Sequence, residues 1–198
     1  MPRVFRASSF LALTICAFAA AGCGDPFQLR APLETRSDSF AISALTRTPA
    51  SSRALWRMAA FTRYRLDSIG ATFDLGFDID NAGRITAYPA RRIATPPPGT
   101  LVAPPLVGLV GSATAYASAD RAPENGYVSD SALVITRGQT VFVRSNSDFC
   151  QSQNTGATLL YAKFVVDSVN AATRELFVRA AIQPSCNFRS FAPGVPTF

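Results

Sequence analysis

The stretch ATFDLGFDIDNAGRITAYP, residues 71–89, decides the fold class. Apolar side chains stand at every second position from Phe73 to Ile79, and acidic residues or glycine stand between them. A period of two predicts a strand with one face toward a core, and the turn residues DNAG before a second alternating run predict a return strand. Residues 71–89 therefore indicate a β-hairpin with one face in water.

Related signals lie on both sides of this hairpin. Residues 39–46 (SFAISALT) alternate as a first strand should, residues 131–145 (SALVITRGQTVFVRS) predict a second, tight hairpin, and residues 158–183 (TLLYAKFVVDSVNAATRELFVRAAIQ) predict a longer third one. Residues 51–68 (SSRALWRMAAFTRYRLDS) fit one helical face at their start and strand alternation at their end. For them we expect a short helical or irregular start followed by a strand.

The middle of the chain contains a proline-rich connection and an uncharged segment. Residues 89–105 are too rich in proline for a helix or a central strand, so we expect a long crossing connection. Residues 101–119 carry no charge, but their prolines and glycines break any membrane helix, and a long bent strand is expected from Val107. About eight to ten strands with little helix predict a mainly β, single-domain antiparallel β-sandwich or partly open barrel.

The first 22 residues have the pattern of a secretory signal peptide. MPRVFR carries Arg3 and Arg6, and ASSFLALTICAFAAAG, residues 7–22, carries no charge. This apolar run is shorter than the ~20 residues that a stable membrane-spanning helix needs. We therefore expect cleavage rather than a permanent span.

Residues 20–23, AAGC, resemble the lipobox of bacterial lipoproteins. The resemblance implies a diacylglycerol on the Cys23 thiol, cleavage just before it and acylation of the new amino group, and two or three acyl chains make detachment slow. Gly24 stands where an Asp would favour the inner membrane, so the resemblance favours the outer membrane. The implied organisation is a signal at 1–22, a lipidated tether at 23–38 and a β-rich domain at 39–198. An ordinary signal peptide that happens to contain a cysteine is the alternative.

The positions of the four cysteines indicate which of them can form a disulfide. Cys16 leaves with the signal and Cys23 is the lipid site, so Cys150 and Cys186 remain as a pair in an oxidising compartment. We expect them to form a structural disulfide. A catalytic or metal-binding thiol is the alternative, although the chain contains no histidine to accompany it.

The composition excludes several classes of chemistry. The absence of histidine removes Ser/His/Asp and Cys/His nucleophile systems and His-ligated metal sites. The single lysine, Lys163, lies inside a strand pattern and is expected to face water. The formal net charge of +6 is spread without any run of three basic residues, which argues against nucleic-acid binding. No cofactor or metal is expected.

Three carboxylates are the best candidates for catalysis. Asp74, Asp78 and Asp80 lie on one predicted strand face, on which alternate residues are about 7 Å apart, a spacing compatible with an inverting glycosidase pair. Together with Asn81 they also bear some similarity to a calcium loop. A solvated strand face that leads into an Asp/Asn turn explains the same residues, and we favour that interpretation.

These observations predict a lipid-anchored protein of the bacterial cell envelope with a non-catalytic binding or structural β domain, similar to small envelope lipoproteins. One alternative is a carboxylate-dependent enzyme acting on cell-envelope glycans. Another is an accessory subunit of an envelope complex, in which a partner protein covers a sheet edge or the apolar strand within residues 107–119.

Overall fold

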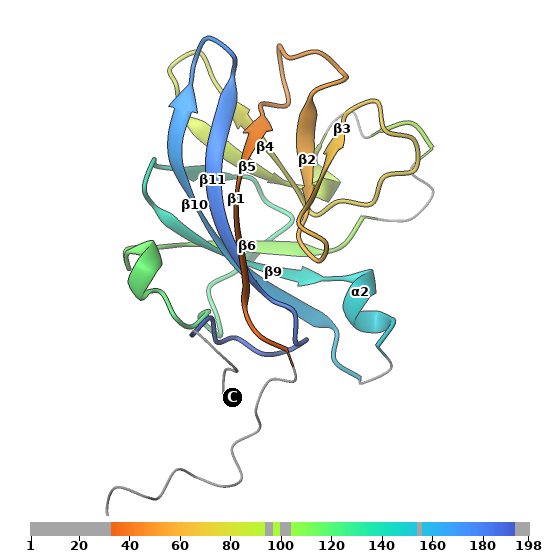
Figure 1. Cartoon of the computed structure of the whole chain (residues 1–198), viewed down its shortest axis with the longest axis vertical. Helices are drawn as coiled ribbons and strands as arrows, with labels where there is room; N and C mark the ends of the chain where they lie inside the picture. Colours follow the sequence, from red (N-terminus) through yellow and green to blue (C-terminus); the bar gives the residue numbers. More distant parts are fainter. Residues whose placement is uncertain (1–32, 94–96, 100–103, 154–155, 193–198) are drawn as a thin grey trace, which may run out of the picture.

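The computed structural model describes residues 33–93, 97–99, 104–153 and 156–192, which fold into two antiparallel β-sheets packed face to face (Figure 1). In spatial order the larger sheet contains β1 (Arg36–Ser43), β11 (Glu175–Gln183), β10 (Leu159–Asn170), β9 (Thr140–Asn146), β6 (Val107–Ser112) and β7 (Val128–Ser129). The smaller sheet contains β3 (Thr62–Arg65), β2 (Arg53–Arg57), β4 (Leu75–Ile79), β5 (Ile85–Pro89) and β8 (Leu133–Ile135). The sheets do not close into a barrel, so the predicted mainly β fold is confirmed as a sandwich.

The core fills the space between the two sheets and is centred on aromatic rings. Phe164 on β10 meets Trp56 of β2 and Phe77 of β4 edge-on, with ring centroids 6.2 and 5.3 Å apart. Phe40 of β1 lies 5.3 Å from the Trp56 ring. All four side chains are buried, so residues from both ends of the chain form one apolar layer that holds the sheets together.

Two of the three predicted hairpins are present. β4 and β5 pair antiparallel from Leu75 opposite Pro89 to Ile79 opposite Ile85, and β10 pairs with β11 around the turn at residues 171–174. β1 begins at Arg36, ahead of the boundary predicted near residue 39, and pairs with β11 along its whole length. The predicted signal peptide, the lipobox with Cys23 and the first part of the tether lie outside the described residues.

The helical start predicted within residues 51–68 is wrong, because residues 53–57 form strand β2. Trp56 points into the core between the sheets, whereas Leu55 packs with Phe73 and Ala90 on the outer face of the smaller sheet. Both faces of β2 are therefore apolar, and a strand buried on both faces loses the period of two that would have identified it.

The tight hairpin predicted at residues 131–145 is also wrong. The turn itself forms, since Gln139 donates its backbone N–H to the Thr136 carbonyl. However, β8 pairs with β5 in the smaller sheet, while β9 pairs with β10 and β6 in the larger one. The turn carries the chain from one sheet to the other, because a turn signal specifies a reversal of direction and not the partner of the next strand.

Two further features concern the middle of the chain. The proline-rich connection crosses as expected, from β5 in the smaller sheet to β6 in the larger sheet. β6 ends at Ser112 and is followed by the short 3₁₀ turn η2 (Tyr116–Ser118), so the strand is shorter than the long one predicted. Within the described parts of the chain, no helix is long and apolar enough to span a membrane.

Candidate functional site

A groove of about 570 Å³ opens on the outer face of the five-stranded sheet. Its walls come from the segment after β1, the segment after β3, the outward positions of β4 and β5, and the chain that follows the 3₁₀ turn η1 (Ala90–Arg92). The lining residues are Leu45, Thr46, Thr48, Ala50, Leu66, Asp67, Asp78, Tyr88, Arg92, Ile93 and Pro98. The groove is thus mainly apolar with a few polar groups, as is usual for small-molecule sites of this volume.

The base of the groove depends on Gly76. A Cβ atom at this position would lie 2.9 Å from a methyl carbon of Leu45 and 2.9 Å from one of Ile93. Glycine therefore lets these two side chains approach the sheet closely, and like Leu66 they pack against the cluster of Leu55, Phe73 and Ala90. Leu45 is further fixed because its backbone N–H donates to the Phe77 carbonyl at 2.7 Å.

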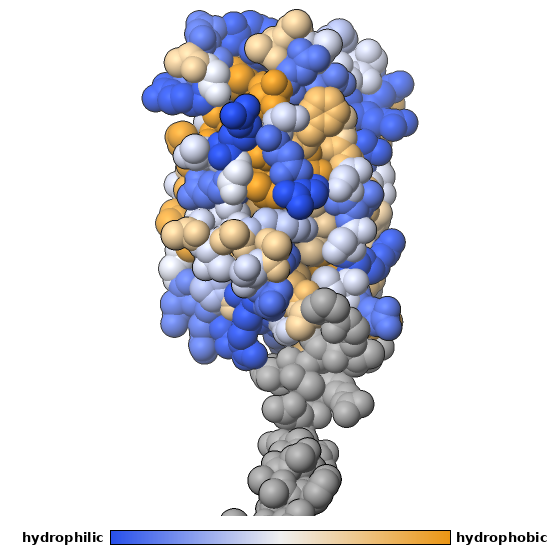
Figure 2. Space-filling view, turned by 60° about the vertical axis from the view of Figure 1, so that its left-hand side comes forward, coloured by the Kyte–Doolittle hydropathy of each residue, from blue (hydrophilic) through white to orange (hydrophobic). Residues whose placement is uncertain are grey.

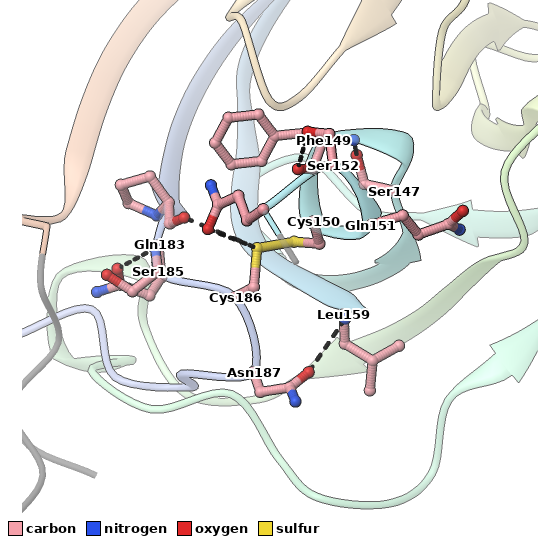
Figure 3. The surroundings of a disulfide bond; sticks show 12 residues. Ser147, Phe149, Cys150, Gln151, Ser152, Leu159, Gln183, Ser185, Cys186 and Asn187 are labelled. Carbon is pink, nitrogen blue, oxygen red and sulfur yellow. Dashed lines mark hydrogen bonds between the residues drawn. A yellow bond between two sulfur atoms is a disulfide. The ribbon is translucent and has the colours of Figure 1, made fainter. Parts of the chain in front are cut away.

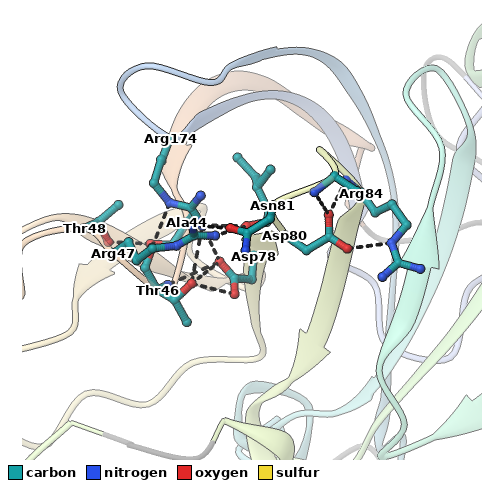
Figure 4. Close-up of polar contacts among 11 residues, drawn as sticks. Ala44, Thr46, Arg47, Thr48, Asp78, Asp80, Asn81, Arg84 and Arg174 are labelled. Atoms are coloured by element: carbon teal, nitrogen blue, oxygen red, sulfur yellow. Dashed lines mark hydrogen bonds and ion pairs between the residues drawn. The ribbon is translucent and has the colours of Figure 1, made fainter.

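Asp78 forms the polar end of the groove (Figure 4). Its carboxylate pairs with the Arg174 guanidinium at 3.0 Å and accepts a hydrogen bond from the Thr46 hydroxyl at 2.9 Å. Arg174 also donates from Nε to the Thr46 carbonyl at 2.9 Å. The turn between β10 and β11 thereby holds the segment after β1 in place, and the Asp78 charge is balanced.

Asp80, in contrast, belongs to the turn between β4 and β5. One carboxylate oxygen accepts the backbone N–H groups of Ala82 and Arg84 at 2.8 and 2.9 Å, and the other pairs with the Arg84 guanidinium. Hydrogen bonding from Arg84 lowers the pKa of Asp80 below its usual range. Figure 4 shows this carboxylate pointing toward Arg84, while Asp78 points toward Thr46 and Arg174. The turn interpretation of Asp80 is therefore confirmed.

Asp74 does not lie on a wet face as the sequence predicted. Its side chain is buried, and it accepts hydrogen bonds from the Met58 backbone N–H at 2.8 Å and from the Ser145 hydroxyl at 2.6 Å. Burial raises the pKa of Asp74, and the two hydrogen bonds oppose that rise. Because Ser145 belongs to β9, Asp74 is a polar link between the two sheets.

The three aspartates consequently do not share one groove. Asp74 is inside the sandwich, Asp78 is at the groove and Asp80 is in a turn, so the arrangement required for a glycosidase pair is not formed. Asn81 contacts Arg47 and does not complete a ligand set. In the described ranges, no three His, Cys, Asp or Glu side chains gather closely enough to hold a metal ion.

Lys163 is buried, which corrects the prediction that it faces water. Its ammonium group donates to the backbone carbonyls of Tyr116 and Ala119 at 2.9 and 3.1 Å and lies 4.6 Å from the centre of the Tyr116 ring. Burial lowers the pKa of Lys163. The position does point outward from β10, but the segment containing η2 covers the outer face of the sheet there.

The disulfide prediction is confirmed. Cys150, in the short helix α2 (Asp148–Gln151), is bonded to Cys186 after β11, with the sulfur atoms 2.02 Å apart (Figure 3). Both residues are buried, and hydrogen bonds of Ser147, Gln183 and neighbouring side chains surround them. The bond therefore ties the segment after β9 to the C-terminal segment and leaves neither thiol free for chemistry.

Other apolar surface lies away from the groove. The view in Figure 2 shows apolar side chains gathered in the upper half of one face, between hydrophilic ones. A hollow of about 470 Å³ lies where β8 forms the sheet edge, and Ile85, Val134, Ile135 and Val169 contribute to it. In the apolar segment proposed for a partner protein, Val107 and Leu109 are buried and β7 pairs with β6 at Gly108 and Leu109, whereas residues 113–115 beyond β6 are exposed.

These observations define the class of protein structurally as an antiparallel two-sheet β-sandwich with one internal disulfide and an apolar groove on its smaller sheet. No family model, no curated protein and no solved structure matches the chain. Apart from Asp78, the sequence analysis missed the groove residues. The glycine at residue 76 in an otherwise regular strand was the one signal of a close approach.

Proposed function

We propose that this chain is a lipoprotein of the bacterial cell envelope whose β-sandwich binds a small, largely apolar molecule and does not transform it. The groove on the five-stranded sheet carries the proposal. Its base is made of Leu45, Leu66 and Ile93, and its volume of about 570 Å³ suits a small ligand. The polar groups that it offers are few, as in sites that select ligands by shape and one or two hydrogen bonds.

The charges around the groove support binding rather than catalysis. Asp78 is paired with Arg174, and Asp67 is paired with Arg65 at 2.7 Å. A general acid or base must lie within hydrogen-bonding distance of the substrate atom that gains or loses the proton. The Asp78 and Asp67 carboxylates instead form ion pairs with guanidinium groups.

The position of the groove also suits a tethered protein. The described chain starts at Leu33, whose backbone N–H donates to the Ser185 hydroxyl at 3.0 Å. The start of β1 lies toward the lower end of the molecule in Figure 1. From there β1 runs upward for eight residues, about 26 Å at the usual rise, to the segment that lines the groove. A lipid on Cys23 would hold the lower end near the membrane and leave the groove accessible.

The anchor is tested by Cys23→Ser. We expect this variant to lose lipid-mediated membrane attachment and to accumulate as the uncut precursor, because the thiol is the proposed acceptor of the diacylglycerol. Incorporation of labelled fatty acid and the mass of the amino-terminal peptide measure both effects. Cys16→Ser, in the expected signal, is the matched control and should be labelled and cut as the wild type is. A Cys23→Ser protein that is still cut before residue 23 and still labelled would refute the anchor.

The groove is tested with phenylnaphthylamine, a neutral apolar dye that fluoresces when it leaves water. We expect saturable binding that weakens about tenfold or more in Ala50→Trp, because a large side chain on the exposed wall fills the groove. Ala60→Trp, on an exposed turn at the opposite end of the β2–β3 pair, is the matched control and should bind the dye normally. Equal binding by both variants would contradict the assignment of the groove.

A further inference from the structure

Arg92 is the one lining residue whose charge is not balanced by a carboxylate within the described structure. It lies next to Arg91, and both guanidinium groups reach Asp130. The Asp130 carboxylate pairs with Arg91 at 3.3 Å, whereas Arg92 donates from Nε only to the Asp130 backbone carbonyl. Toward the described residues, the two terminal nitrogens of Arg92 make no other hydrogen bond or ion pair, and both can serve as charged donors.

The Tyr88 hydroxyl is a second polar group at the same groove. Tyr88 points outward from β5, lines the groove with Arg92 and is half-buried. Its hydroxyl forms no hydrogen bond with the described part of the chain. A guanidinium and a phenol that both lack a partner among the described residues at this groove form a combination suited to an oxygen anion, because charge-assisted hydrogen bonds are the stronger ones.

The acidic residues that line the groove do not cancel its preference for an anion. Asp78 and Asp67 have their own arginine partners, Arg174 and Arg65, so each contributes a neutral pair. Arg92 therefore leaves the groove with a net positive group beside an apolar base made of Leu45, Leu66 and Ile93. That pattern complements a molecule with an apolar body and one negative end.

We propose that the ligand is an apolar chain or ring that bears a single anionic group of the carboxylate kind, bound by Arg92 and Tyr88, an inference that rests on the proposed function of the groove. The apolar body lies on the Leu45, Leu66 and Ile93 side chains. Selectivity between an acid and the corresponding alcohol then comes from Arg92.

The test compares octanoate with octanol as competitors of bound phenylnaphthylamine. Octanoate should displace the dye at concentrations about tenfold lower than octanol, the factor that one charge-assisted hydrogen bond supplies at a partly open site. In Arg92→Gln this advantage should vanish while octanol displaces the dye as before, and Arg92→Lys, which keeps the charge, should retain part of it. Arg137→Gln, an exposed arginine away from the groove, removes the same charge and should change neither competitor.

The outcomes separate the two proposals. If the dye does not bind in a saturable way, the groove function and the ligand class both fail. If the dye binds and Ala50→Trp weakens it, but octanoate and octanol displace it equally, only the ligand class is overturned. An octanoate advantage that survives in Arg92→Gln, or that is lost equally in Arg137→Gln, overturns the role of Arg92.

Discussion

Phe164→Ala is expected to lower the free energy of unfolding by about 3 to 5 kcal/mol, the range for deleting a large buried aromatic side chain. Phe164 is completely buried on β10 and contacts Trp56 and Phe77 of the opposite sheet edge-on. Its removal leaves a cavity at the place where the two sheets meet. Urea unfolding, followed by circular dichroism and by the fluorescence of the single tryptophan, measures the loss.

Phe177→Ala is the matched control for this experiment. Phe177 lies on the neighbouring strand β11, but its side chain points away from the core and is 45% exposed. Truncating it should cost at most about 1 kcal/mol, as is usual for substitutions at the surface. If the two variants lose the same stability, Phe164 does not hold the sheets together and the packing described here is wrong.

The double variant Cys150→Ser, Cys186→Ser is expected to be about 4 kcal/mol less stable than the oxidised protein. The bond joins residues 36 positions apart, and closing a loop of that length restricts the unfolded chain by about this amount in the chain-entropy model. For a domain of this size the melting temperature should fall by about 10 °C. The β-sheet circular dichroism spectrum at low temperature should be unchanged, because the bond holds segments outside the strands.

Reduction of the wild-type protein provides the control for the two serine substitutions. The reduced wild type should melt near the double variant, since both lack the same covalent link. Thiol titration of the unfolded, unreduced protein should detect no free thiol from Cys150 or Cys186. Two reactive thiols, or a melting temperature that neither reduction nor substitution changes, would contradict a stabilising disulfide.

The sequence was sufficient to predict the features that do not depend on the tertiary fold. The β4–β5 and β10–β11 hairpins were predictable because alternating apolar residues flank short turns, and the chain between two consecutive strands of one sheet is short. The disulfide was predictable because only Cys150 and Cys186 remain as a pair once the signal and the lipid site are set aside. Neither inference required knowledge of distant neighbours.

The errors share a physical cause, which is contact with distant parts of the chain. Lys163 and Asp74 occupy positions that alternate outward in the strand pattern, yet the segment containing η2 covers Lys163, and Asp74, which precedes β4, turns inward to Ser145 of the opposite sheet. β8 and β9 are separated by a short turn but belong to different sheets. Strand alternation predicts which residues share a face only within the strand that forms, so Phe73, ahead of β4, packs on the outer face while Leu75 and Phe77 face the core. The tertiary fold decides whether a face meets water.

The groove was beyond prediction for the same reason. Leu45, Leu66 and Ile93 come from three separate connections that line one groove, and no motif joins them in the sequence. A fourth part of the chain also takes part, because Arg174, in a turn 96 residues after Asp78, forms an ion pair with that carboxylate at the groove. Binding sites assembled from connections in this way leave few signals in a single chain.

The most direct test of the central claim is a methyl-labelled nuclear magnetic resonance titration with phenylnaphthylamine. Aromatic rings shift the resonances of methyl groups that they contact, so the methyls of Leu45, Leu66 and Ile93 should move together and saturate at one affinity, while the core methyls of Ile42 and Leu160 stay in place. Shifts confined to Val134 and Ile135 at the other hollow, or no saturable shift at all, would contradict the proposal that this groove is the binding site.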